Sequence, residues 1–80
     1  MNAATIEKNL RTIICDELGL DEEAVTLDAH LVNDLGADSL DQVELIMRCE
    51  EDFKIQIDDD AADRMVYVKD ILNHLKRRVK

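Results

Sequence analysis

The sequence predicts an all-α protein, a small bundle of three to four helices with a long loop between the first and second helices. Three observations predict this class. Hydrophobic residues make up 46% of the 80 residues, whereas there are only two glycines, no proline, one tyrosine and one phenylalanine, and such a composition favours helices. Apolar residues recur at helical spacing in three stretches. No stretch shows the strict alternation of apolar and polar residues that is typical of a half-buried strand.

The length fits one domain covering residues 1–80, because no linker, internal repeat or low-complexity segment divides the chain. A chain this short removes only roughly 60–65% of its unfolded surface from water, so its core must be small and tightly packed. No signal peptide, transit-type presequence or transmembrane-length apolar run is visible. We therefore expect a cytoplasmic monomer with no stable membrane insertion, although an organelle stays open if a presequence has been removed.

The first helix is expected from about Thr5 to Leu18, with Gly19 supplying the left-handed residue that commonly follows a helix end. Its apolar residues recur at helical spacing: Ile6, Leu10, Ile13, Ile14 and Leu18. A long connection over residues 20–37 follows, and its first acidic residues, 21–23, can open a single helical turn. Four apolar residues should hold this connection against the core: Val25, Leu27, Leu31 and Leu35.

The second helix is expected from Ser39 to about Phe53, with Asp38 as the N-cap and Asp41 completing an approximate capping box. At 100° per residue its apolar residues fall into two groups whose centres lie about 140° apart. The first group should face the core: Leu45, Ile46, Cys49 and Phe53. The second group should be exposed, because a helix in a small bundle buries one face: Leu40, Val43 and Met47.

A short acidic element is expected around residues 59–65, and the last helix from Val66 to Arg78. The last helix has one apolar stripe: Val68, Ile71, Leu72, Leu75 and Val79. Its last turn is basic, where cations complement the helix dipole.

Charge is spread unevenly along the chain. Residues 16–63 include 17 acidic residues and two basic ones, a net charge of −15, whereas residues 64–80 include six basic residues and one acidic one, a net charge of +5. The acidic segment should repel nucleic acid and anionic membranes and attract basic protein surfaces. Nucleic acid is therefore excluded as the expected partner.

Neither cysteine nor carboxylate spacing predicts a specific metal site. Cys15 and Cys49 match no metal motif, a disulfide is not expected, and Cys49 should be a small buried hydrophobe while Cys15 is partly exposed. Residues 58–60 begin like a calcium-binding loop, but Asp63 stands where that loop needs glycine.

Ser39 lies where the second helix begins, and it can be a helix-start residue, a nucleophile or an attachment point. A nucleophilic serine needs a base and an oxyanion site, yet only His30 and His74 are available, His74 is expected to be exposed, and no G-x-S-x-G turn is present. A covalent phosphate on Ser39 would lie at a helix N-terminus, which favours anions. The exposed apolar group is also flanked by carboxylates, Glu44 and Glu51 on one side and Glu50 on the other, which is typical of a docking surface.

The segment 34–53, DLGADSLDQVELIMRCEEDF, resembles the central segment of the acyl carrier proteins, particularly the stand-alone type II bacterial carriers. The likeness covers nearly the whole chain: LGL ends the first helix, DEEAVT follows in the loop, and IQIDDDAADRM stands where the family usually has an I-P-[DE]-E-E-A-type stretch. D-S-L is the family's phosphopantetheine attachment motif, and its serine matches Ser39. D-S-L alone is a weak signal, but within G-A-D-S-L-D-x-V-E-L it is highly specific.

The resemblance implies that a phosphopantetheinyl transferase attaches 4′-phosphopantetheine from coenzyme A to Ser39, where it holds acyl groups as thioesters. The chain would be a carrier rather than an enzyme, presenting acyl groups to loading, elongating and acyltransferase enzymes of fatty-acid or related lipid or polyketide biosynthesis. Leu45, Ile46 and Phe53 would help line the acyl cavity. The positions that match the family's partner contacts are Asp38, Leu40, Asp41, Val43, Glu44, Met47, Glu50 and Glu51.

Several positions depart from the family's pattern and leave the pathway open. Arg48 replaces a small apolar residue, Asp58 replaces a usual proline, the tail is more basic, and no threonine caps the last helix at residues 66–67. Two alternatives remain: an aminoacyl or peptidyl carrier, which more often reads G-G-[HD]-S and is less acidic, and an unmodified acidic helical adaptor.

Overall fold

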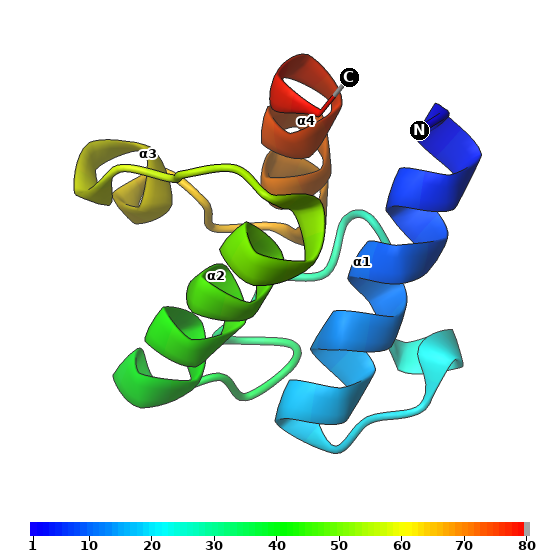
Figure 1. The fold of residues 1–80 in the computed structure, drawn as a ribbon. Coiled ribbons are helices and arrows are strands. Elements are labelled where there is room, and N and C mark those ends of the chain that lie inside the picture. The colour runs from blue at the N-terminus through cyan, green and yellow to red at the C-terminus, as the bar shows by residue number, and fades with distance from the viewer. Residues whose placement is uncertain (80) are drawn as a thin grey trace.

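The structure is a computed structural model that describes residues 1–79. Four α-helices and one 3-10 turn form the described part of the chain: α1 (Ala3–Leu18), η1 (Glu22–Ala24), α2 (Ser39–Phe53), α3 (Asp59–Asp63) and α4 (Val68–Arg78). Figure 1 shows α1, α2 and α4 around a common centre and the short α3 to one side, beyond the end of α2. The predicted all-α class and the long loop between the first two helices are confirmed.

Helix α1 begins two residues earlier than predicted. The Asn2 side chain caps it, because its Oδ1 accepts a hydrogen bond of 2.9 Å from the backbone N–H of Thr5. The predicted end at Leu18 is confirmed: Gly19 has φ +67°, and its N–H donates to the carbonyl of Cys15. A residue other than glycine would be strained at this φ.

The core lies where α1, α2 and α4 meet, and the loop residues predicted to join it do so. Val25, Leu31 and Leu35 are buried, while Leu27 is half-buried and packs against the same cluster. Each helix adds its predicted stripe, and the largest fully buried side chains come from all three: Leu10, Ile13, Ile14, Leu45, Val68, Ile71 and Leu75. Burial of one such side chain stabilises a fold by about 1.5–3 kcal/mol.

Cys49 is part of this core, as predicted, and Cys15 is half-buried. Burial raises the pKa of the Cys49 thiol to about 12. It also raises the pKa of the Cys15 thiol, with Glu22 and Asp16 adding to the rise. Both thiols therefore stay protonated near neutral pH, and Cys49 acts as a small apolar side chain.

The long loop is tied to the segment that precedes α4. The backbone N–H of Leu31 donates to the carbonyl of Val66 at 3.0 Å, and the N–H of Val68 donates to the carbonyl of Ala29 at 3.1 Å. The predicted start of the last helix at Val66 is therefore wrong, since Val66 and Tyr67 are used in this pairing and α4 begins at Val68.

The cap that the sequence lacked at the start of α4 comes from inside the helix. Asp70 Oδ2 accepts hydrogen bonds from the backbone N–H groups of Val66, at 3.0 Å, and Tyr67, at 2.9 Å. At α3 the capping residue instead precedes the helix: Asp58 Oδ1 accepts a hydrogen bond of 2.7 Å from the N–H of Ala61. The residue that stands in place of a proline is thus the N-cap of α3, which ends at Asp63, two residues before the predicted limit.

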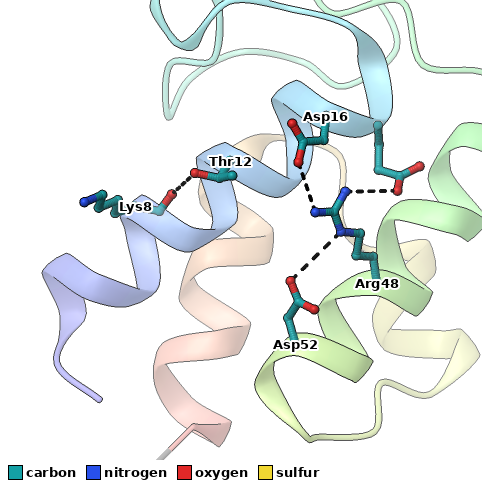
Figure 2. A network of polar contacts seen from close by, with 6 residues as sticks. Lys8, Thr12, Asp16, Arg48 and Asp52 are labelled. Carbon is teal, nitrogen blue, oxygen red and sulfur yellow. Dashed lines mark hydrogen bonds and ion pairs between the residues drawn. The ribbon is translucent and has the colours of Figure 1, made fainter.

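Arg48 on α2 joins this helix to α1 through carboxylates (Figure 2). Its guanidinium lies 3.0 Å from Asp16 and 3.4 Å from Glu17, both in the last turns of α1, and 4.0 Å from Asp52 one turn further along α2. The hydrogen bond to Asp16 is the main cause of a raised pKa for Arg48. The sequence indicated that this arginine interrupts the acidic field; the structure shows that it neutralises a point where acidic residues of two helices converge.

We expect replacement of Arg48 by alanine to lower the melting temperature, because the carboxylates of Asp16, Glu17 and Asp52 would then repel one another without a counter-charge. Raising the salt concentration should shrink the difference from the parent protein, since salt screens this repulsion. Thermal unfolding followed by circular dichroism at low and high salt measures both effects.

The matched control is Lys8→Ala, which removes one positive charge from α1 at a residue whose side chain makes no ion pair within residues 1–79. Equal destabilisation by Arg48→Ala and Lys8→Ala would show that the ion pairs of Arg48 do not specifically stabilise the fold. Only an effect of net charge would then remain.

Candidate functional site

The turn that leads into α2 is organised by His30. Its backbone N–H donates to Asp34 Oδ2 at 2.7 Å, and its ring Nδ1 accepts from the N–H groups of Val32, at 3.1 Å, and Asn33, at 3.0 Å. Through these two bonds Nδ1 holds the ring against the backbone of its own turn. His30 is therefore a structural residue of the turn rather than a base for Ser39.

After this turn the chain bends sharply to start α2. Gly36 has φ +74°, a conformation that favours glycine, and Ala37 is buried, with its N–H donating to the carbonyl of Leu31 at 2.9 Å. Ser39 comes two residues later as the first residue of α2, with its side chain in the exposed class. The bend thus holds Ser39 at a fixed, accessible place on a helix end.

The predicted capping box around Ser39 is confirmed. Asp38 Oδ1 accepts from the backbone N–H of Asp41 at 2.8 Å, and Asp41 Oδ2 accepts from the N–H of Asp38 at 3.1 Å. No side chain within residues 1–79 is hydrogen-bonded to the Ser39 hydroxyl. Ser39 is also the chain's one serine. The hydroxyl is free to react with an incoming group, yet no base or oxyanion site is arranged to make it a nucleophile on its own.

A cleft of about 370 Å³ opens beside Ser39, between α2 and α3. Ile46 lines this cleft, as the resemblance implied, but Leu45 and Phe53 do not, because both are buried in the core on the other side of α2. The α2 residues that line it are Ser39, Gln42, Val43, Ile46, Met47 and Glu50; the others are Ile57, Asp59, Ala62 and Asp63. The contribution of α3 could not be predicted, since nothing in the sequence pattern fixes where so short a helix packs.

The second apolar group of α2 is exposed, as its angular position predicted. Leu40 is 64% exposed, Val43 55% and Met47 53%, and the carboxylates of Glu44 and Glu51 are exposed next to them. Such exposure is large for three apolar side chains one helical turn apart. The arrangement provides an apolar stripe with charges at its edge on the helix that begins with Ser39.

Glu50 differs from the other acidic residues of α2. It is half-buried, and its Oε2 accepts a hydrogen bond of 2.8 Å from the backbone N–H of Ile57. Its carboxylate thereby holds the segment that connects α2 to α3 and lies at the edge of the cleft. The sequence placed Glu50 only among candidate partner contacts and missed this internal role, since the bond joins residues seven apart across a loop.

The prediction that His74 is exposed is wrong. The ring is half-buried on α4, and its Nε2 is buried without a hydrogen-bond partner among residues 1–79. Burial lowers the pKa of His74, and the neighbouring Arg78 and Arg77 lower it further. No group of three or more His, Cys, Asp or Glu side chains that could hold a metal is found among residues 1–79, and no helix there is long and apolar enough to cross a membrane.

A helical bundle that displays an unpartnered serine at a helix start, beside a cleft and an exposed apolar stripe, has the features of a carrier domain that holds a prosthetic arm. Residues 8–75 match the family model described as "Phosphopantetheine attachment site". The chain is 43% identical over 77 residues to an acyl carrier protein of Akkermansia muciniphila, covering 96% of each chain. It is 46% identical over 79 residues to an acyl carrier protein of Guillardia theta, covering 99% of this chain and 98% of the relative.

The chain therefore belongs to the acyl carrier protein family. This membership confirms the predicted function as a carrier of acyl groups, the predicted prosthetic group, 4′-phosphopantetheine, and the prediction that the chain is not an enzyme. It also confirms that a phosphopantetheinyl transferase and acyl-handling enzymes are its general class of partners.

We expect Asp38→Ala to destabilise the protein by about 1 kcal/mol, the usual effect of losing an N-cap side chain, because it removes the carboxylate that accepts the hydrogen bond from the N–H of Asp41, while the reciprocal bond from the Asp38 backbone N–H to Asp41 is kept. Denaturant unfolding measures the change as a lower midpoint with an unchanged slope.

Glu51→Ala is the control, since it removes the same charge from the same helix at an exposed side chain that makes no hydrogen bond or ion pair within residues 1–79. If the two variants unfold at the same denaturant concentration, the capping box does not stabilise α2.

Proposed function

We propose that the Ser39 hydroxyl is the attachment point of 4′-phosphopantetheine, and that the chain presents acyl groups to enzymes of fatty-acid or related lipid or polyketide biosynthesis in the cytoplasm. One observation carries the proposal: the chain's single serine is exposed at the first position of α2, on the edge of the cleft between α2 and α3. The match of residues 8–75 to a phosphopantetheine attachment model supports it.

The surroundings of Ser39 fit a phosphodiester. A phosphate on Ser39 would lie at the N-terminus of α2, where the first N–H groups lack intrahelical partners and the positive end of the helix dipole favours an anion. Asp38 and Asp41 work in the other direction, since their carboxylates lie within the same turn. The opposing effects would keep the phosphate near the helix end without binding it tightly, which suits an arm that has to move between enzymes.

When bound, the group supplies a thiol at the end of a flexible arm, to which acyl groups are joined as thioesters. The chain's own contribution is shelter and presentation. Val43, Ile46, Met47, Ile57 and Ala62 give the cleft an apolar lining, and burial in such a lining stabilises an acyl chain by about 0.8 kcal/mol per CH₂ group. An acyl chain can thus leave water at the place where it is attached.

The exposed side of α2 is proposed as the surface that partner enzymes recognise. Leu40, Val43 and Met47 offer apolar contact, while the exposed carboxylates of Glu44 and Glu51 attract basic surfaces and fix the orientation of docking. The proposed partners are a phosphopantetheinyl transferase and acyl-loading, elongating and acyltransferase enzymes. Three further predicted contact residues also belong to this region: Asp38 and Asp41 at the start of α2, and Glu50 at the edge of the cleft. Their carboxylates are engaged in internal hydrogen bonds as well.

Incubation of the unmodified chain with coenzyme A and a broad-specificity phosphopantetheinyl transferase should add the mass of one phosphopantetheine. Ser39→Ala should abolish the addition, whereas Thr26→Ala, which removes an exposed hydroxyl elsewhere in the chain, should leave it complete. Intact-mass spectrometry gives the result. Addition to the Ser39→Ala variant, or none to the parent chain, would show that Ser39 is not the attachment point.

Charge reversal on α2 tests the docking surface. We expect Glu44→Lys to slow the transfer of phosphopantetheine about tenfold, because a like charge replaces an attractive one at a basic partner surface, with thermal stability nearly unchanged. Glu22→Lys makes the same charge change at an exposed residue of η1 and should have less than about a twofold effect. Transfer rates at low salt measure both.

Equal slowing by Glu44→Lys and Glu22→Lys would attribute the effect to net charge and contradict a docking surface on α2. Glu50→Lys is not a clean variant for this purpose, because it also removes the hydrogen bond to the N–H of Ile57.

A further inference from the structure

A second groove lies on the opposite side of α3, between α3 and α4. Its volume is about 220 Å³, and its polar lining residues are Arg64, Asp70, Asn73, His74 and Arg77. It shares no residue with the cleft beside Ser39. The groove is basic, whereas the rest of the chain is strongly acidic, with a net charge of −9 over 80 residues.

The two arginines of this groove have no acidic partner. Arg11 pairs with Glu7, and Arg48 has three carboxylates around it, but no carboxylate within residues 1–79 forms an ion pair with Arg64 or Arg77. In a chain with 19 acidic residues and 10 basic ones, unpaired guanidinium groups are not explained by a shortage of carboxylates. Two of them line one groove.

The groove's one carboxylate is already used. Asp70 Oδ2 accepts from the backbone N–H groups of Val66 and Tyr67, at 3.0 and 2.9 Å. It caps the start of α4, so its position is fixed by the helix rather than by the arginines. Asp70 compensates only part of the positive charge of Arg64 and Arg77.

His74 is the second unusual feature of the groove. It lines the groove and is half-buried, and its Nε2 is buried without a hydrogen-bond partner within residues 1–79. The charged groups around it are Arg77 and Arg78 on α4, which lower its pKa, and Asp58 at the start of α3, which raises it, while burial is the largest effect and lowers it. Arg64 and Asp70 face the same groove. The ring is thus held neutral at a place where a nearby anion would favour its protonated form.

We propose that the groove between α3 and α4 binds the phosphate group of a phosphorylated small molecule as its dianion. Guanidinium groups match phosphate oxygens with paired N–H donors, and the Asn73 amide adds a further donor. Charge balance favours a dianion over a monoanion: Arg64, Arg77 and a protonated His74 together carry three positive charges, which Asp70 and a phosphate monoester dianion neutralise.

The site is separate from acyl carriage and can be tested whether or not Ser39 is modified. The probe is inorganic phosphate at pH 7, added to the full chain at constant ionic strength, with chloride as the control anion. Amide and histidine ring signals are followed by NMR. Saturable shifts should be confined to residues of the groove, and the pKa of His74 should rise by about one unit, the effect of an opposite charge within about 4–6 Å. Because His74 then takes up a proton, the affinity calculated for the dianion alone, rather than for total phosphate, should increase as the pH falls.

Four variants separate a built site from a generally basic helix end. Arg64→Gln and Arg77→Gln should each weaken phosphate binding about tenfold, since each removes a charged donor pair. Lys76→Gln removes one positive charge from α4 at an exposed residue that neither lines the groove nor shifts the pKa of His74, and it should change binding less than about twofold. His74→Gln should remove the pH dependence of the affinity for the dianion while the amide spectrum stays native.

Vesicles separate a free phosphate ester from a lipid headgroup. The chain is sedimented with vesicles of phosphatidylcholine, with and without phosphatidic acid. Free phosphate should abolish any binding to either kind of vesicle. The proposal is overturned if phosphate gives no saturable shift, if Lys76→Gln weakens binding as much as Arg64→Gln and Arg77→Gln, or if only the phosphatidic acid vesicles bind.

Discussion

The function of this chain depends on α2 being packed on one face only. Leu45, Cys49 and Phe53 are buried against the rest of the core, and they fix the rotation of the helix about its axis. Once that rotation is fixed, Leu40 and Met47 have to face water. An isolated apolar stripe of this kind is unfavourable for the carrier alone, and it becomes favourable when a partner or an acyl chain covers it.

Electrostatics impose a second constraint, because the acidic surface proposed to attract basic partners also brings like charges close together. Acidic residues from α1 and α2 converge near the end of α1, and Arg48 is placed among them at 3.0 Å from Asp16. The ion pairs of Arg48 join α2 to α1, and Arg48 does not line the cleft to which Val43 and Met47 belong. The chain can thus keep its docking side acidic, while the seam that holds α2 in position is neutralised.

Most of the fold could be predicted because it rests on local signals. The bounds of α2 followed from Asp38 as a cap and from periodicity, both of which are written in adjacent residues. The start of α4 was predicted wrongly because it depends on a contact between distant segments: Val66 and Tyr67 pair with the loop around His30, and only the folded chain brings these together. The tertiary pairing overrides the helical pattern at those two positions.

The candidate site divides along the same line. The position of Ser39 at the start of α2 and the exposure of the apolar stripe follow from the local sequence and from helical geometry, so the sequence was sufficient for both placements. The cleft did not follow, since one of its walls depends on the placement of α3, a five-residue helix with no apolar stripe of its own. The internal bond of Glu50 to Ile57 was missed for the same reason: a carboxylate on a helix surface looks like a docking residue until the loop that it holds is placed.

Helix α3 lies between the two hollows of the molecule, since its residues line both the cleft beside Ser39 and the groove against α4. Asp59, Ala62 and Asp63 face the cleft beside Ser39, and Arg64, which follows α3 directly, faces the groove against α4. So short a helix has little packing of its own, and Glu50 and Asp58 hold it chiefly through single hydrogen bonds. An anion bound between Arg64 and Arg77 at the proposed site would therefore restrain the α3 wall of the cleft beside Ser39. Because a ligand shifts a conformational equilibrium only by its differential affinity for the two states, such coupling requires that the groove close when α3 approaches α4, and the cleft widen by the same movement.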